Sequence, residues 1–154
     1  MSLEKTAKKL AEAKKQREEV DWNAERDWWL AALGALYNQI EVWLAPLREQ
    51  GLVSSARVPV QLSEEKIGTY TADQLVLEFG PEAIVLEPKG CLIVGARGRV
   101  DVFRRGSRGE QVMLVLSGSK AEPRWEIWPN RDPRQRKVVR KASFEKLLET
   151  LLQE

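Results

Sequence analysis

Short runs of alternating apolar and polar residues fill residues 52–141, and they constrain the fold more than any other feature of the sequence. In RVPVQL (57–62), Val58, Val60 and Leu62 share one face, and in QLVLEF (74–79) apolar side chains again occupy every second position. A period of two is typical of strands with one face on a core. Further strands are predicted at 82–88, 91–96, 98–104, 110–117, 124–129 and 136–139.

Most connections between these runs contain about two to five residues. Parallel neighbours need a crossover of about a dozen residues or more, so consecutive strands are expected to pair antiparallel. Pro59 lacks a backbone donor and marks an edge strand or a strand start. We therefore predict an antiparallel meander of about seven strands within residues 56–141, curled into a half-barrel.

Residues 21–50 have the pattern of an amphipathic helix. Asp21 is the predicted N-cap, because its side chain can accept a hydrogen bond from a free N–H of the first turn. Pro46 is expected to end or kink the helix near Ala45, and Gly51 suits the position just beyond its end. Apolar side chains recur every three or four residues, the spacing of one helix face, at Trp29, Leu33, Leu36, Ile40, Trp43 and Leu47.

The two ends of the chain also read as helix. Residues 1–20 are mostly strong helix formers with few apolar positions, so they predict a charged extension that buries little. SFEKLLETLLQE predicts a short amphipathic helix at 143–153, capped by Ser143. The expected fold is α+β, with a long N-terminal helix broken near residue 20 and ending near 45–50. The domain proper spans 21–154.

Antiparallel strands followed by a C-terminal helix resemble the architecture of pleckstrin-homology-like domains. The long N-terminal helix departs from that pattern. The resemblance implies only an architecture, because one fold supports many functions.

The composition narrows the chemistry. The chain has no histidine and one cysteine, Cys91, which excludes a Ser-His-Asp triad, an intrachain disulfide and a Cys₂His₂ zinc site. Cys91 lies in an apolar run and is expected to be a buried, inert thiol. With 43% hydrophobic and 31% charged residues and no apolar run of membrane-spanning length, we expect a folded cytoplasmic protein.

Carboxylates are the remaining candidates for catalysis. Three pairs occur in polar strand or turn positions, where solvated carboxylates are expected, and no nucleophile and base can be combined with them. No catalytic residue, metal ligand or cofactor is therefore predicted. The pairs are Glu64 with Glu65, Glu78 with Glu82, and Asp101 with Glu110.

Basic residues are concentrated in residues 97–141, which carry 13 basic and 5 acidic side chains and a net charge of +8. These cations either form a solvated surface that protects strand edges or bind an anion such as nucleic acid. Trp128 is expected on a polar strand face, where it could stack on a base. The candidate anion-binding residues are Arg104, Arg105, Arg108, Arg124, Arg131, Arg134, Arg136, Lys137, Arg140 and Lys141.

The tryptophans of the long helix have two interpretations. They pack on the sheet, in which case Trp29 to Trp43 form the core with strand residues, or part of the stripe is a dimer interface. The candidate dimer contacts are Trp22, Trp29, Leu36 and Trp43. The predicted core strand residues are Leu75, Leu77, Val100, Val102, Leu114 and Leu116.

These observations favour a non-enzymatic protein-interaction module that forms a homodimer through the tryptophan-rich helical region or binds a protein partner. A nucleic-acid-binding protein that uses residues 97–141 is the alternative. A small carboxylate-based enzyme is the third hypothesis.

Overall fold

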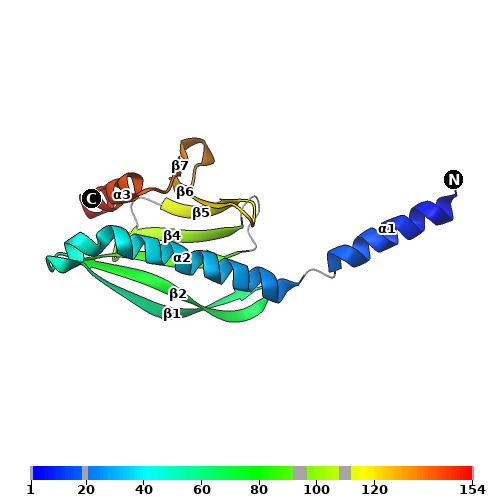
Figure 1. Ribbon diagram of the computed structural model, residues 1–154, viewed down its shortest axis with the longest axis horizontal. Coiled ribbons are helices and arrows are strands. Elements are labelled where there is room, and N and C mark those ends of the chain that lie inside the picture. Colours follow the sequence, from blue (N-terminus) through cyan, green and yellow to red (C-terminus); the bar gives the residue numbers. More distant parts are fainter. Residues whose placement is uncertain (1, 19–20, 92–96, 108–111, 154) are drawn as a thin grey trace.

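The computed structural model describes residues 2–18, 21–91, 97–107 and 112–153 (Figure 1). It has the predicted α+β fold, with two N-terminal helical segments, an antiparallel sheet and a short C-terminal helix. The elements are α1 (Leu3–Glu18), α2 (Trp22–Glu49), β1 (Ser54–Glu64), β2 (Gly68–Phe79), β3 (Glu82–Gly90), β4 (Gly98–Arg104), β5 (Val112–Gly118), β6 (Pro123–Pro129), a 3₁₀ turn (Pro133–Gln135), β7 (Lys137–Val138) and α3 (Lys141–Gln153).

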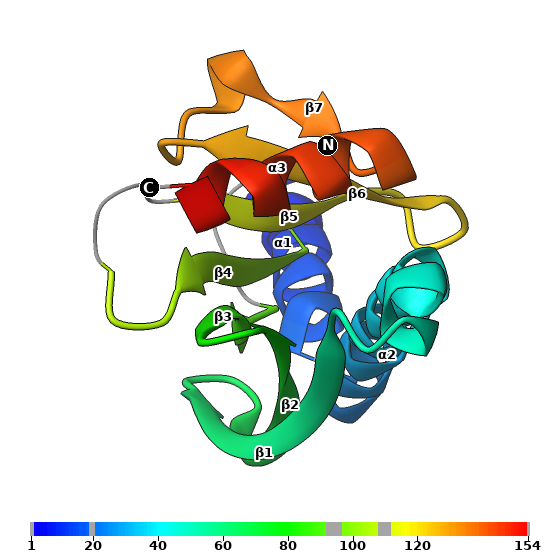
Figure 2. The ribbon, with the colours of Figure 1, turned by 90° about the vertical axis from the view of Figure 1, so that its left-hand side faces the viewer.

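The sheet is an open meander in which seven strands follow one another in sequence order. All neighbouring pairs are antiparallel. Figure 2 shows that the sheet curls around α2, while α3 lies across one end. Because β3 pairs directly with β4, the predicted strand at 91–96 does not separate them. Cys91 follows β3, and residues 92–96 lie outside the described residues.

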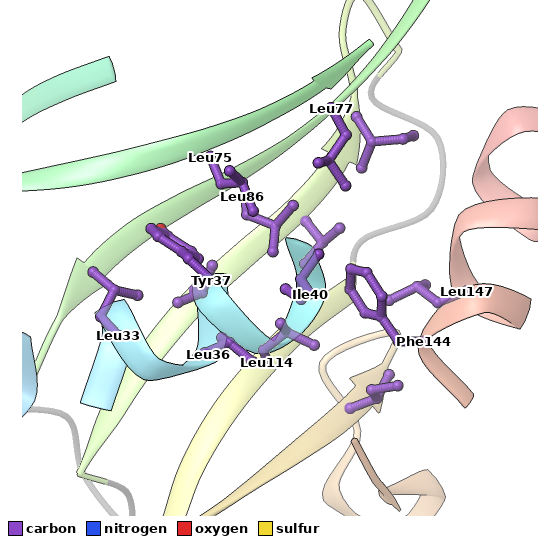
Figure 3. Packing of buried hydrophobic residues seen from close by; sticks show 14 of the residues in the cluster. Leu33, Leu36, Tyr37, Ile40, Leu75, Leu77, Leu86, Leu114, Phe144 and Leu147 are labelled. Carbon is purple, nitrogen blue, oxygen red and sulfur yellow. The ribbon is translucent and has the colours of Figure 1, made fainter. Parts of the chain in front are cut away.

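The core lies between α2 and the concave face of the sheet, and the predicted core residues form it. Leu33 and Ile40 of α2 pack with Leu75, Leu77 and the inner residues of β4 and β5. Figure 3 shows Phe144 and Leu147 of α3 pointing toward α2 at the end of this cluster. Trp43 differs from the prediction because it is only partly buried. Its remaining surface lines a groove described below.

The edge strand β1 does not place all of its apolar residues inside. Val58 remains 41% exposed. Arg57 instead reaches α2, where its Nη2 atom lies 2.7 Å from Oε1 of Glu41 and 2.7 Å from Oδ1 of Asn38. Its guanidinium also lies over the Tyr37 ring, 5.6 Å from the centroid. An arginine therefore fixes this strand to the helix, where a strict alternation would place a hydrophobic residue.

Helix α2 begins as predicted and ends later than Pro46. The Asp21 side chain accepts a hydrogen bond of 3.0 Å from the Ala24 N–H. Pro46 lies inside the helix, so it does not end the helix near Ala45, one of its two predicted effects; the helix ends at Glu49, within the predicted range of 45–50. Pro46 and Val42, the residue four positions earlier, are both exposed, so water can replace the hydrogen bond that proline cannot donate.

The C-terminus of α2 is closed by glycine. Gly51 has a φ of +72°, in the left-handed region that glycine adopts without a steric penalty. Its N–H donates to the Arg48 carbonyl at 3.0 Å, and the Leu52 N–H donates to the Leu47 carbonyl at 2.9 Å. These two bonds satisfy the last carbonyls of the helix in the Schellman arrangement.

Helix α3 begins at Lys141, two residues before the predicted start. Ser143 still caps it, but from inside the first turn, where its Oγ accepts a 2.8 Å hydrogen bond from the Arg140 N–H. The same hydroxyl donates to the Val138 carbonyl at 2.8 Å. The predicted apolar face is buried at Phe144, Leu147, Leu148 and Leu151.

Helix α1 extends away from the rest of the chain (Figure 1). Leu3 is 85% exposed and Leu10 is 66% exposed. This matches the expectation that the segment buries little. Among the described helices, none combines the length and apolar composition that a membrane crossing requires.

Candidate interaction groove

A groove of about 440 Å³ lies between α2 and the last two strands. Its lining is mostly apolar, and α2 forms one wall while β6 and β7 form the other. The lining residues are Ala32, Ala35, Leu36, Gln39, Trp43, Pro123, Arg124, Trp125, Val138 and Val139.

Two tryptophans of the groove pack against buried aromatic rings of the core. Trp125 packs on Trp29 with ring centroids 6.1 Å apart. Trp43 packs on Phe144, also at 6.1 Å. Trp29 and Phe144 are fully buried, so both indoles of the groove rest on the core. The two groove indoles therefore lose little side-chain freedom when a partner covers them.

The α2 wall is low and about three turns long. Ala32 and Ala35 present only methyl groups, so another backbone can approach closely. From Ala32 to Trp43 the helix rises about 16 Å at 1.5 Å per residue. On the opposite wall, β7 has two residues, and the Val139 N–H donates to the Trp125 carbonyl at 2.9 Å. On this edge of the sheet, β7 pairs only with Glu126 and Ile127 of β6.

Cations border the β7 side of the groove. Lys137, Arg140 and Lys141 are exposed, and none of them forms an ion pair within the described residues. Lys137 lies opposite Ile127 in the β6–β7 pairing. Directly paired residues share a sheet face, so Lys137 lies on the same side of the sheet as Ile127. We call Lys137, Arg140 and Lys141 the basic rim.

The other predicted anion-binding arginines are mostly paired. Glu126 is 6% exposed on the convex face, and its Oε2 lies 3.3 Å from Nη2 of Arg124 and 3.8 Å from Nε of Arg136. The Nε1 of Trp128 donates to the other Glu126 oxygen at 3.3 Å. Trp128 is half-buried, and its indole N–H already donates to Glu126 within the chain.

A second carboxylate on the same face holds two more arginines. Asp101 receives bonds of 2.7 Å and 3.0 Å from Arg99, and its Oδ2 lies 3.8 Å from Nη2 of Arg131. Arg134 binds Asp132 through its side chain and backbone N–H, and these bonds lower the pKa of the Asp132 carboxyl. Asp101, Glu126 and Asp132 therefore each balance one positive charge within residues 97–141.

The structure describes Arg104 and Arg105 of the three predicted hairpin arginines. Arg104 donates from Nη1 to the Leu152 carbonyl of α3 at 3.5 Å. A cation at this position is favourable because the helix dipole is negative at the C-terminus. Arg105 is exposed, and Arg108 lies outside the described residues. Val102 of β4 and Pro129 of β6 both lie opposite Val112 of β5. The sheet therefore brings the hairpin arginines and the turn after β6 to the same end.

The predicted dimer contacts separate into two groups. Trp29 is fully buried and Leu36 is 4% exposed, so Trp29 offers no surface to a second chain and Leu36 offers only the small part that lines the groove. Their assignment as dimer contacts is corrected: they pack on the sheet, as the other interpretation expected. Trp22 and Trp43 keep part of their surface.

Polar groups also meet beside the buried end of β3. The Glu64 carboxylate accepts hydrogen bonds from the Tyr70 hydroxyl and, at 3.1 Å, from the Cys91 N–H. Burial and the Glu64 charge raise the pKa of the Cys91 thiol to about 12. Burial and the hydrogen bond to Glu64 raise the pKa of the Tyr70 hydroxyl as well. The burial of Cys91 expected from the sequence is confirmed.

The predicted carboxylate pairs do not form a common site in the described part of the chain. Glu64 interacts with Tyr70 and Cys91, and Glu78 lies opposite Ala83 rather than Glu82. Glu110 lies outside the described residues. No group of three potential metal-binding side chains occurs within the residues that the structure describes.

Comparison with known proteins adds no functional assignment. No family, curated protein or solved structure matches the chain. The groove itself was not predicted. Its walls come from positions 32–43 and 123–139, and the available signals were the alanines between the tryptophans of α2 and the very short last strand.

Proposed function

We propose that the protein is a non-enzymatic protein-interaction module whose groove receives an amphipathic helix of another polypeptide. The observation that carries this proposal is the apolar groove with Trp43 and Trp125 in its lining. Tryptophans supported by a core make effective anchors for a partner, because little freedom is lost when they are covered.

The shape of the groove favours a helix over a strand. Because β7 pairs with Glu126 and Ile127 in the middle of β6, each free end of β6 is only two or three residues long, too short for a strand to add along it. The α2 wall offers about three turns of contact with small side chains at Ala32 and Ala35. A helix with apolar residues at i, i+4 and i+7 would cover both tryptophans.

The experiment is a selection of helical peptides from a displayed library on the full-length protein, followed by calorimetry of the enriched sequences. Ala35→Phe fills the groove from its exposed wall, and Ala31→Phe is the matched control on the exposed α2 surface outside the lining. We expect Ala35→Phe to weaken binding about tenfold or more, and Ala31→Phe to leave it unchanged. A library without groove-dependent binders, or equal binding to both variants, would contradict the proposal.

We also propose self-association in the cytoplasm, through Trp22 and the exposed apolar residues of α1 rather than through the groove. Leu3 and Leu10 are largely exposed, and Trp22 is only half-buried. The reduced, buried Cys91 suits a reducing compartment. Light scattering would give twice the 17.6 kDa chain mass for a dimer.

Nucleic-acid binding is the second candidate, because strand pairing places Arg105 and Arg131 at the same end of the sheet. Fluorescence anisotropy with short single-stranded and duplex oligonucleotides at low and moderate salt tests it. Binding should weaken steeply with salt, and Trp128→Ala should weaken single-strand binding selectively. Affinity no tighter than about 10⁻⁴ M would remove this candidate.

A further inference from the structure

We propose that the helix bound in the groove is acidic along one flank, and that the basic rim selects it. This inference rests on the proposed function and adds the chemistry of the partner. Its basis is that the two walls differ in charge: the α2 wall is neutral, whereas the β7 side carries Lys137, Arg140 and Lys141.

The rim cations differ from the other basic residues around β6. Arg124 and Arg136 share Glu126, and Arg99 and Arg131 share Asp101, so one of the two positive charges in each pair is balanced within the chain. No such carboxylate reaches the rim within the described part of the chain. An exposed cation beside a dry, apolar contact attracts an opposite charge at the border of the interface and discriminates against like charge.

The position of the rim sets where the partner's carboxylates must lie. Val138 and Val139 line the groove directly, and the rim residues flank them in sequence. Lys137 lies on the same sheet face as Ile127, and Lys141 begins α3 directly after Arg140, close in sequence to the Phe144 that packs on Trp43. A helix with leucines toward the tryptophans therefore presents one flank to cations and the other to Ala32, Ala35 and Gln39.

The same charge argument separates this partner from helix α1 of a second copy. Residues 3–18 contain six basic and three acidic side chains, a net charge of +3. A basic helix next to the basic rim is repelled, so the groove favours an acidic partner over α1 in trans. A nucleic acid would also match the rim charge, and its bases could stack on the groove tryptophans, so an oligonucleotide is included in the test below.

Three synthetic peptides test the inference with the full-length protein. All are alanine-rich helices of about 15 residues with leucines at i, i+4, i+7 and i+11. The first carries glutamates on the flank that would face the rim, the second carries glutamines there, and the third carries the glutamates on the opposite flank. We expect the first to bind about tenfold more tightly than the other two at low salt, with the difference shrinking as salt rises.

A rim variant and a matched control locate the effect. Lys137→Gln, Arg140→Gln and Lys141→Gln together should weaken binding of the first peptide to the level of the glutamine peptide. The same variant should bind the glutamine peptide with unchanged affinity. Lys5→Gln, Lys8→Gln and Lys9→Gln change the net charge equally on the exposed helix α1, and this control should retain the preference.

The outcomes separate this inference from the proposed function. If all three peptides bind equally and Ala35→Phe weakens each of them, the groove receives a helix but the acidic partner is wrong. If none binds, the groove itself fails as a docking site. If a short oligonucleotide binds more tightly than the first peptide and loses affinity in the rim variant, the rim serves nucleic acid and the inference is overturned.

Discussion

Trp29 illustrates how single residues determine the packing of this fold. Its indole is fully buried and lies directly against the backbone of β4 at Gly98. A Cβ atom at Gly98 would lie 2.2 Å from the indole ring, closer than any real contact. Trp29 also supports Trp125, so glycine at this position determines how one of the two groove tryptophans is held.

Gly98→Ala should therefore destabilise the protein by about 1–3 kcal/mol, because the ring or the strand must move to admit one methyl group. Gly34→Ala is the control, since a Cβ there meets nothing within 4 Å. Alanine should stabilise the interior of α2 by about 0.5–1 kcal/mol. Urea denaturation measures both changes. Equal effects of the two substitutions would contradict the close contact between Gly98 and Trp29.

The buried Cys91 thiol should make the free energy of unfolding depend on pH. Its pKa of about 12 lies above the ordinary thiol value of about 9.0, so the folded protein keeps the thiol proton at a pH where the unfolded chain loses it. The stabilisation is complete below about pH 9 and is lost as pH rises toward 12. The free energy of unfolding should fall between pH 8 and pH 10.5, less steeply in Cys91→Ala.

The raised pKa values of Tyr37 and Tyr70 act in the same direction, so Cys91→Ala removes only part of the slope. A disulfide reagent at pH 8 gives an independent measurement. The native thiol should react far more slowly than the thiol in urea, because the thiolate is the reactive form. Equal rates in the two states would contradict the burial of Cys91.

At the scale of elements, the ends of α2 show how local rules act. Asp21 and Gly51 close the helix as their residue types predict, whereas Pro46 sits inside it without ending it. Proline disrupts a helix through its missing N–H and a steric clash, and both matter less on an exposed face near the last turn. The glycine at position 51, rather than the proline, marks the end of the helix.

Gly51→Ala should destabilise the protein by about 1 kcal/mol, because alanine is strained at the left-handed φ of +72°. Asp21→Ala should cost a similar amount, about 0.5–2 kcal/mol, by leaving the Ala24 N–H without its acceptor. Thermal and urea unfolding measure both. Pro46→Ala is the comparison, and it should not destabilise the helix.

Alternation predicted most of the sheet because a period of two reports one buried face. It failed where another interaction replaced burial. Arg57 contacts α2 through an ion pair and hydrogen bonds, so a charged residue of β1, rather than an apolar one, faces the helix.

At the scale of the whole molecule, the candidate site was harder to predict than the fold. The groove joins residues of α2 with residues about 90 positions later, and only the curl of the sheet brings them together. The arginine–carboxylate pairs were more accessible to sequence reasoning. Arg99 and Asp101 on β4, and Arg124 and Glu126 on β6, are each two positions apart, a spacing that places two strand residues on one face. Arg134 and Asp132 are also two positions apart, but they lie in the 3₁₀ turn and at its N-cap.

Deleting residues 1–18 should leave the free energy of unfolding unchanged, because α1 is exposed and extends away from the core. Under the proposed self-association, the same deletion should convert a dimer into a monomer. Urea denaturation and light scattering on one sample separate the two effects. Loss of cooperative unfolding would show that α1 belongs to the core, and an unchanged mass would remove α1 from the dimer contact.

The order of the strands has a consequence for synthesis of the chain. Every strand pairs with its neighbour in sequence, so each hairpin can form as soon as it leaves the ribosome. The core side chains of α2 emerge first, however, and Leu36 must wait for Leu116, 80 residues later, before the cluster that buries both is complete. At about 5–20 residues per second, that interval lasts about 4–16 s. During translation, the apolar stripe of α2 is therefore the segment most exposed to chaperones and to aggregation.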